Sequence, residues 1–445
     1  MRPRPVAAKG DSMRIVMIGT GYVGLVSGAC FSDFGHDVVC VDKDAGKVDA
    51  LLAGRIPIFE PGLDQLVANN FEAGRLAFTL DLAAAVPEAD AVFIAVGTPS
   101  RRGDGHADLS YVHAAAEEMA PLLRPGAVVV TKSTVPVGTG DTVERIIRKH
   151  RPDLEFSVAS NPEFLREGAA IDDFKRPDRV VVGVNDEHAE TVLREIYRPL
   201  VRSESPLLVM SRRAAELTKY AANAFLATKI SFINEIADLC ERVGADVQDV
   251  AYGIGLDTRI GARFLQPGPG YGGSCFPKDT LALLKTGEDY EAPLRIVEAV
   301  VKSNESRKRS MGRKVVQALG GKAHGKTVAV LGLTFKANTD DMRDSPAIAI
   351  VQALQDAGVQ IHAYDPEGME QAAKVIDKVT YCTDAYDAMD GADAAVIVTE
   401  WDAFRALDLD RVQSLLKTPL LVDLRNLYDH AELERRGFRY IGVGR

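Results

Sequence analysis

The chain has 445 residues, and at about 150 residues per domain this length predicts about three domains. Hydrophobic residues make up 46% of the chain and charged residues 26%, a globular balance that excludes a largely disordered protein. The 63 acidic and 53 basic residues give a net charge of −10, which argues against binding nucleic acid by broad phosphate neutralisation. No stretch reaches the roughly 18–20 apolar residues that cross a bilayer.

The start of the chain and its cysteines indicate where the protein works. Residues 1–12 contain no apolar segment, so we expect a disordered tail rather than a secretory signal. The 5 cysteines are odd in number and far apart, and the 8 histidines form no HExxH motif or tight cluster with them. We therefore expect no metal site, no membrane association and a reducing, cytoplasmic setting.

Short apolar runs alternate with helical patterns from residue 13 to about 210. This alternation is typical of βαβ units and predicts an α/β domain with a parallel sheet. The predicted strands are Arg14–Ile18, Asp37–Val41, Ala91–Val96, Ala127–Thr131, Phe156–Ala159, Val180–Val184 and Leu207–Met210.

A long helix is predicted next, over Arg212–Val243, because this segment contains neither proline nor glycine and Gly244 follows as a C-terminal cap. Its 32 residues would span roughly 48 Å. Apolar residues surround most of its axis, so we expect burial on several sides. Our hypothesis is that this helix joins two lobes and forms a homodimer interface, which a monodisperse monomer in light scattering would contradict.

The α/β alternation returns near Gly325. Strands are predicted at Thr327–Leu331, Gln360–Tyr364, Ala394–Thr399 and Leu420–Asp423, in an order that echoes the first segment. We therefore predict two Rossmann-like parallel-sheet lobes, a long central helix and a small helical dimerisation domain. The predicted parts are a tail over 1–12, a first α/β domain over 13–210, a helical dimerisation domain over 211–318 and a second α/β domain over 319–445.

A glycine-rich motif, Gly19-Thr20-Gly21-Tyr22-Val23-Gly24, directly follows the first strand and opens a helix. In this context Gly19 permits the turn, Gly21 lets a pyrophosphate approach the backbone, and Gly24 lets helix and strand pack closely. Asp42 ends the next strand, where a carboxylate binds ribose hydroxyls and repels a 2′-phosphate, which favours NAD over NADP. Thr98 ends another strand and is a candidate contact.

Cys275 differs from the other cysteines, which lie within apolar patterns. Four glycines precede it within a few residues, and Pro277 suits the first turn of a following helix. The partial positive charge of a helix N-terminus stabilises a thiolate. A thiolate beside NAD can add to an aldehyde, so that a second hydride leaves a tetrahedral carbon and water then releases an acid. The sequence thus predicts a four-electron oxidation that uses two NAD per turnover; the alternative is a buried cysteine beside a flexible loop.

Several ordered segments of the chain resemble the UDP-glucose/GDP-mannose dehydrogenase family, the nucleotide-sugar 6-dehydrogenases, over nearly the whole chain. These segments are GTGYVGLVSG, VGTPS, KSTVPVGTG, NPEFLREGAAIDDF, ELTKYAANAFLATKISFINEI, GGSCFPKD, GLTFKANTDDMRDSPA and DLRNLYD. The resemblance implies oxidation of the C6 hydroxyl of a UDP-hexose, with UDP-glucose favoured, to the uronate. It also implies two Rossmann-like lobes, an NAD-binding domain over 13–210 and a UDP-sugar-binding domain over 319–445, and a dimer formed through the long helix.

The same resemblance implies catalytic roles. Cys275 is the implied nucleophile, and Lys219 and Asn223, four residues apart on the long helix, stabilise the C6 oxyanion. Thr134 assists proton removal through a water molecule, and Glu163 transfers a proton during hydrolysis. Asp279 orients the lysine and the water.

Binding roles are implied in the same way. The implied cofactor-binding residues are Gly19, Gly21, Tyr22, Val23, Gly24, Asp42, Lys47, Thr98, Thr134, Glu167, Lys278 and Arg343. The implied substrate-binding residues are Glu163, Phe164, Leu165, Lys219, Asn223, Arg259 from the neighbouring subunit, Phe264, Tyr271, Gly272, Lys336 and Arg425.

Three alternatives remain open at this point. A sister enzyme would act on GDP-mannose or a UDP-N-acetylhexosamine, which kcat/KM on the three sugars would separate. A single-step hydroxyacid dehydrogenase would release one NADH per substrate rather than two. A catalytically silent nucleotide sensor would bind NAD without turnover.

Overall fold

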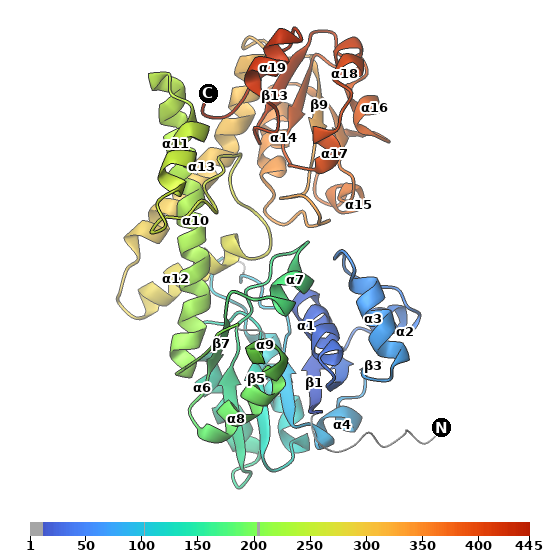
Figure 1. The fold of residues 1–445 in the computed structure, drawn as a ribbon, viewed down its shortest axis with the longest axis vertical. Helices are drawn as coiled ribbons and strands as arrows, with labels where there is room; N and C mark the ends of the chain where they lie inside the picture. Colours follow the sequence, from blue (N-terminus) through green and yellow to red (C-terminus); the bar gives the residue numbers. More distant parts are fainter. Residues whose placement is uncertain (1–11, 102, 203–204) are drawn as a thin grey trace. The chain divides into compact units, whose positions relative to one another are not determined.

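A computed structural model describes residues 12–101, 103–202 and 205–445 of the chain (Figure 1). It divides into two compact units, Met1–Ala221 (unit 1) and Ala222–Arg445 (unit 2). The division falls within the long helix rather than before it, and the domain boundaries drawn from the sequence stay predictions. The expected tail lies almost wholly outside the described residues.

Unit 1 is built on an eight-stranded sheet in the order β3-β2-β1-β4-β5-β6-β7-β8. Neighbouring strands are parallel except β6 and β7, which make an antiparallel contact through Ser160 and Gly183. All seven predicted strands are present, and the short strand β3 was missed. The strands are β1 (Arg14–Ile18), β2 (Asp37–Val41), β3 (Leu76–Thr79), β4 (Ala91–Ile94), β5 (Ala127–Thr131), β6 (Phe156–Ser160), β7 (Val180–Gly183) and β8 (Leu207–Met210).

Helices cover this sheet, and two hydrophobic clusters form its core. Strands β4 and β5 are buried throughout, as expected for central parallel strands with helices on both faces. Helix α1 packs closely on β2 because Gly28 has no side chain. A Cβ atom at Gly28 would lie only 2.6 Å from the sulfur of Cys40. The helices are α1 (Tyr22–Asp33), α2 (Ala45–Leu52), α3 (Leu63–Glu72), α4 (Leu82–Ala85), α5 (Ser110–Met119), α6 (Thr139–His150), α7 (Ala170–Lys175), α8 (Glu187–Ile196) and α9 (Arg198–Arg202).

Helix α10 spans Arg212–Val243, the bounds predicted from the sequence, and continues from unit 1 into unit 2. The prediction succeeded because no proline or glycine interrupts the segment, and Gly244 follows it with φ +75°, a conformation that glycine adopts without strain.

Unit 2 contains a six-stranded parallel sheet in the order β11-β10-β9-β12-β13-β14. The four predicted strands are β9 (Thr327–Leu331), β10 (Gln360–Tyr364), β12 (Ala394–Ile397) and β13 (Leu420–Asp423); the edge strands β11 (Thr380–Tyr381) and β14 (Arg439–Ile441) were missed. The helices are α11 (Val247–Gly255), α12 (Phe276–Asp289), α13 (Arg295–Ala318), α14 (Pro346–Asp356), α15 (Met369–Ala372), α16 (Ala385–Met389), α17 (Asp402–Arg405), α18 (Leu409–Leu415) and α19 (His430–Arg435).

The two sheets share a strand order at their centres. In unit 1 the order β2-β1-β4-β5 matches β10-β9-β12-β13 in unit 2. In such sheets ligands bind beyond the carboxyl ends of the strands, where the order reverses. The predicted fold class, two Rossmann-like sheets and a long central helix, is therefore confirmed.

Candidate active site

The glycine-rich loop of unit 1 connects β1 to α1 and needs glycine for steric reasons. Gly19 has φ +103°, and a Cβ there would lie 2.7 Å from the carbonyl oxygen of Ala95. A Cβ at Gly24 would lie 2.0 Å from the carbonyl oxygen of Gly19. Gly21, by contrast, has no atom within 4 Å of a Cβ, so its surroundings leave room for a ligand. Tyr22 and Val23 open helix α1, whose first turn carries no acidic residue that would repel a phosphate.

Asp42 stands directly after β2 and faces this loop. Its carboxylate accepts hydrogen bonds from the Thr20 backbone N–H (2.8 Å), the Thr20 hydroxyl (2.6 Å) and the Asp44 N–H (3.0 Å). Burial alone would raise the pKa of Asp42, but these hydrogen bonds and the nearby charge of Lys47 lower it below its usual value. An ionised carboxylate at this position suits ribose hydroxyls and opposes a 2′-phosphate.

Two predicted threonines meet at the ends of neighbouring strands. Thr98 follows β4, Thr134 follows β5, and the Thr98 hydroxyl donates to the Thr134 carbonyl at 2.9 Å. Ser133 ties the same two loops together, because its hydroxyl donates to the Val96 carbonyl at 2.7 Å. The structure therefore brings Thr98 and Thr134 together at the carboxyl edge of the sheet.

Glu163 and Lys219 form a buried ion pair at this edge. Lys219 Nζ lies 3.0 Å from Glu163 Oε1, and the two side chains are 3% and 5% exposed. Burial alone would raise the pKa of Glu163, but Lys219 and the hydrogen bond from the Leu165 N–H lower it below its usual value. The ring of Phe164 lies 5.3 Å from Lys219 Nζ. Lys219 therefore stands beside a carboxylate that remains ionised.

Two further glutamates, to which no role was assigned from the sequence, hold these loops. Glu60, 7% exposed, accepts from the Tyr22 hydroxyl and from the N–H groups of Gly168 (2.6 Å) and Ala170 (2.7 Å). Burial raises the pKa of Tyr22, and the charges of Glu60 and Glu167 add to the rise. Glu167 therefore lies close to Tyr22, the first residue of α1.

The second of these two glutamates is Glu216, the first residue of the ELTKY motif on helix α10. Its carboxylate accepts from Gly138 N–H (2.7 Å), Gly140 N–H (2.8 Å) and the Ser160 hydroxyl (3.1 Å), and so occupies the N-terminus of α6. This glutamate connects helix α10 to the loop that follows Thr134.

In unit 2, Cys275 occupies the N-cap position of α12, as predicted, and Pro277 lies in the first turn. Asp279 is fully buried; it accepts from Asn223 Nδ2 at 2.6 Å and pairs with Lys278. Its backbone N–H donates to the Cys275 carbonyl at 2.9 Å. The structure thus brings Cys275, Asn223, Lys278 and Asp279 together at the start of α12.

The loop before Cys275 is held by α13 and by α10. Asn304 accepts from the Tyr271 N–H (2.8 Å) and donates to the Tyr271 carbonyl (3.0 Å). Arg307 donates to the Gly268 carbonyl at 3.0 Å. Phe264, at the start of this loop, has φ +66°, a strained conformation for a bulky residue of the kind that clusters at ligand sites.

The predicted substrate residues of the second sheet meet this loop. A Cβ at Gly272 would lie 2.4 Å from the Asp344 carbonyl oxygen, and Gly273 N–H donates to the Arg343 carbonyl at 2.8 Å. Arg425 donates to the Phe335 carbonyl at 3.1 Å, next to Lys336.

Two predicted arginines pair with aspartates. Arg343 pairs with Asp341 at 2.8 Å, close to the glycine loop. Arg259 pairs with Asp257 at 2.6 Å, and its side chain is 87% exposed, so within unit 2 it faces solvent.

Asp365, directly after β10, is the counterpart of Asp42 in unit 2. It is fully buried, and its oxygens accept from the backbone N–H groups of Leu333 (2.7 Å), Thr334 (3.0 Å) and Gly368 (2.7 Å). The Trp401 indole N–H also donates to it, at 3.2 Å. These donors leave the carboxylate no exposed oxygen.

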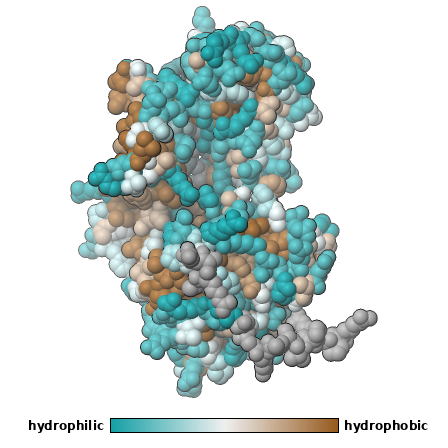
Figure 2. Space-filling model, viewed as in Figure 1, coloured by the Kyte–Doolittle hydropathy of each residue, from teal (hydrophilic) through white to brown (hydrophobic). Residues whose placement is uncertain are grey.

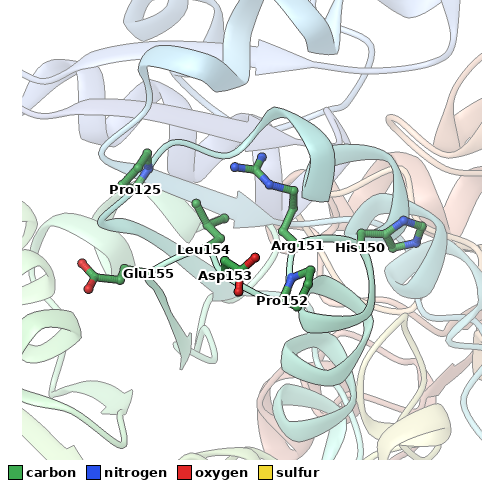
Figure 3. A pocket seen from close by; sticks show the side chains of 7 residues that line it. All are labelled: Pro125, His150, Arg151, Pro152, Asp153, Leu154 and Glu155. Atoms are coloured by element: carbon green, nitrogen blue, oxygen red, sulfur yellow. The ribbon is translucent and has the colours of Figure 1, made fainter.

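A hollow of about 430 Å³ lies elsewhere in unit 1 (Figure 3). It is formed around the connection from α6 to β6 and the turn before β5, at the amino ends of these strands, so it lies at the edge of the sheet opposite Thr134 and Glu163. Its lining residues are Pro125, His150, Arg151, Pro152, Asp153, Leu154 and Glu155.

The described ranges contain neither a cluster of metal ligands nor a helix suited to cross a membrane. In residues 12–445, with the gaps noted above, no group of three or more His, Cys, Asp and Glu side chains is arranged to hold a metal ion. None of the helices in that same part of the chain combines the length and the apolar character that spanning a membrane requires.

Comparisons with known proteins match the chain to three domains of one family, UDP-glucose/GDP-mannose dehydrogenase: the NAD binding domain over residues 13–201, the central domain over 213–306 and the UDP binding domain over 329–430. A UDP-glucose 6-dehydrogenase of Rhizobium meliloti (strain 1021) is 67% identical over 435 residues, which cover 97% of this chain and 100% of the relative. A UDP-glucose 6-dehydrogenase of Pseudomonas aeruginosa is 46% identical over 443 residues, which cover 97% of this chain and 98% of the relative.

Solved structures agree. The UDP-glucose dehydrogenase of the hyperthermophilic archaeon Pyrobaculum islandicum superimposes with a TM-score of 0.90 at 40% identity, covering 99% of this chain and 100% of that one. The prediction of NAD as cofactor is confirmed by the match to the NAD binding domain. The chain therefore belongs to the UDP-glucose/GDP-mannose dehydrogenase family.

Proposed function

We propose that this protein oxidises the C6 hydroxyl of UDP-glucose to the carboxylate of UDP-glucuronate, with two NAD reduced per turnover. The observation that carries the proposal is Cys275 at the N-terminus of α12, beside the Asn223–Asp279 hydrogen bond. The names of the relatives with 67% and 46% identity support UDP-glucose as the sugar nucleotide.

The chemistry proceeds in three steps. The alcohol first loses a hydride and a proton and becomes an aldehyde. The Cys275 thiolate then adds to C6 to form a thiohemiacetal oxyanion, which loses a second hydride and becomes a thioester. Water adds to the thioester, the C–S bond breaks, the sulfur leaves as thiolate, and two protons are released as the carboxylate forms. NAD, when bound, supplies the hydride acceptor for both oxidations.

The remaining catalytic residues stabilise charge or transfer protons during these reaction steps. The Lys219 ammonium and the Asn223 amide donate to the oxyanion that develops on C6. Thr134, through a water molecule, assists removal of the first proton. Glu163, ionised beside Lys219, transfers a proton during thioester hydrolysis. Asp279 holds Asn223 and Lys278 in place.

Substrate binding is assigned to the loop Phe264–Gly272 with Lys336 and Arg425. Cationic side chains next to a glycine-rich backbone suit a diphosphate, which needs both charge and N–H donors. The family's UDP binding domain covers residues 329–430, which include both cations. GDP-mannose and UDP-N-acetylmannosamine, the sugars in the names of two solved relatives, are the comparison substrates for kcat/KM.

We also assign a homodimer to helix α10. Phe225, Phe232 and Leu239 repeat every seven residues on this helix and are 66%, 50% and 53% exposed. A seven-residue repeat places them on one face. Apolar side chains also gather on α11, where Tyr252 is 71% exposed (Figure 2). A Phe232→Asp substitution should yield a monomer in light scattering; a dimer of unchanged stability would contradict the assignment.

The deciding experiment counts NADH. Purified protein should release two NADH for each UDP-glucose consumed, and Cys275→Ala should bind NAD yet form no glucuronate. Cys382→Ala is the matched control, because Cys382 is a buried cysteine of the same unit. One NADH per substrate, or acid formation by Cys275→Ala at the wild-type rate, would refute the covalent route.

A further inference from the structure

Lys132, the first residue after β5, is a buried cation that the proposed mechanism does not use. Its side chain lies among neutral partners: Nζ donates to Asn161 Oδ1 (3.0 Å), to the Asn161 carbonyl (3.4 Å) and to the Tyr197 hydroxyl (3.2 Å). The residue is 3% exposed, and Nζ lies 5.8 Å from the centre of the Phe174 ring.

An ammonium in such surroundings is expensive to bury. Desolvation of a charge is strongly unfavourable unless hydrogen bonds and nearby charges offset it, and an apolar side chain of similar volume would fill the space without desolvating a charge. Burial lowers the pKa of Lys132 to about 8, and the nearby charge of Lys219 contributes to this lowering. Glu163 and Cys30 act in the opposite direction and raise this pKa. Packing alone therefore does not explain a lysine here.

Asn161 links this ammonium to the catalytic segment. Its backbone N–H donates to the Thr131 carbonyl at 2.8 Å, and its side-chain amide donates to the Val181 carbonyl at 2.9 Å. Its Oδ1 accepts from both Lys132 and the Tyr197 hydroxyl (2.6 Å). Lys132 precedes Thr134 by two residues, and Asn161 precedes Glu163 by two. One buried ammonium thus ties together the two segments that carry these side chains.

We propose that Lys132 is a positioning residue for thioester hydrolysis: it fixes the segment after β6, which carries Glu163, against the end of β5. The inference rests on the proposed function, because it gives Glu163 its role in the hydrolytic step.

The test is Lys132→Met, with Lys149→Met as the control because Lys149 is exposed on α6 of the same unit. We expect kcat to fall about tenfold or more, while the NAD dissociation constant stays within about twofold. Because hydrolysis would become the slow step, rapid mixing should give a burst of two NADH per subunit, and intact-mass measurement should detect the glucuronyl thioester on Cys275. The thermal midpoint should not fall, since methionine needs no hydrogen bonds.

Tyr197→Phe provides a milder second variant, because it removes one acceptor of the ammonium and keeps the charge. We expect a fall in kcat of a few fold and the same thioester at a lower level. The inference is overturned if both variants keep the kcat and the mass spectrum of the control, or if kcat falls together with the thermal midpoint and no thioester accumulates. If the wild-type protein itself releases fewer than two NADH, the proposed function fails instead.

Discussion

The buried pair of Lys219 and Glu163 gives a quantitative prediction for folding. Replacing Lys219 by methionine leaves the Glu163 carboxylate 5% exposed and without the ammonium that lies 3.0 Å away. Removing one partner of a buried ion pair costs about 3–5 kcal/mol. At about 2–4 °C per kcal/mol for a unit of this size, a loss of 3 kcal/mol lowers the thermal midpoint of unit 1 by about 6–12 °C.

A double-mutant cycle separates the pair from other effects of the substitution. Lys219→Met combined with Glu163→Gln removes both charges, so we expect a stability within about 1 kcal/mol of the wild type. Thermal unfolding of the cofactor-free protein at pH 7, followed by circular dichroism, supplies the four midpoints. The reasoning is refuted if the single lysine variant is as stable as the double variant.

The pH dependence of stability should have opposite signs in the wild type and in the Lys219→Met variant. In the wild type the pKa of Glu163 is lowered, so its contribution to stability is present above the unfolded value near 4.5 and is lost as the pH falls through the lower folded value. Without Lys219, burial, the largest effect on this pKa, is opposed only by the Leu165 N–H and the charge of Lys132, so we expect the pKa to be raised. The Lys219→Met protein should therefore lose stability as the pH rises through the raised value.

Three further predictions concern the binding of the two ligands and the stability of the glycine-rich loop. Asp42→Ala should weaken NAD binding about tenfold or more and reduce the preference for NAD over NADP, because hydrogen bonds to a charged group contribute about 1.5–3 kcal/mol. Fluorescence titrations with both cofactors measure the two dissociation constants. An unchanged ratio of these constants would exclude the assigned role of Asp42. Gly24→Ala should destabilise unit 1 by about 1–3 kcal/mol or more, since its Cβ would meet the Gly19 oxygen at 2.0 Å; calorimetry tests it, and a normal midpoint would show that the turn can move. Asn304→Ala should raise the KM for UDP-glucose and leave NAD affinity unchanged, because Asn304 holds Tyr271; a parallel loss of both would point to general unfolding.

The sequence predicted the parts of the fold that local patterns determine. Buried runs such as Ala127–Thr131 were recognised as strands, and helix α10 was bounded correctly by its terminal glycine. The edge strands β3, β11 and β14 were missed because they have two to four residues and are only partly buried, so neither length nor apolar character distinguishes them from loops. The antiparallel contact of β6 with β7 depends on tertiary packing alone.

For the site, motifs predicted which residues stand at strand and helix ends, but not their partners. Cys275 could be placed at a helix N-terminus because Pro277 and the glycines are adjacent in sequence. The bond between Asn223 and Asp279 joins residues 56 positions apart, and no periodicity signals such a contact. Glu60, Lys132 and Glu216 were overlooked for the same reason: each is a common charged residue whose role appears only when distant backbone donors or acceptors converge on it.

Asp365 shows how a protein with two similar nucleotide folds keeps its ligands apart. Its carboxylate occupies the position that Asp42 holds in unit 1, but Asp42 is partly exposed, whereas Asp365 is fully buried beneath its backbone donors and Trp401. A ribose could bind there only by displacing the turn that carries Leu333 and Thr334. Calorimetric titration should accordingly find a single dinucleotide per chain, so that the resemblance between the sheets never becomes competition between cofactor and sugar nucleotide.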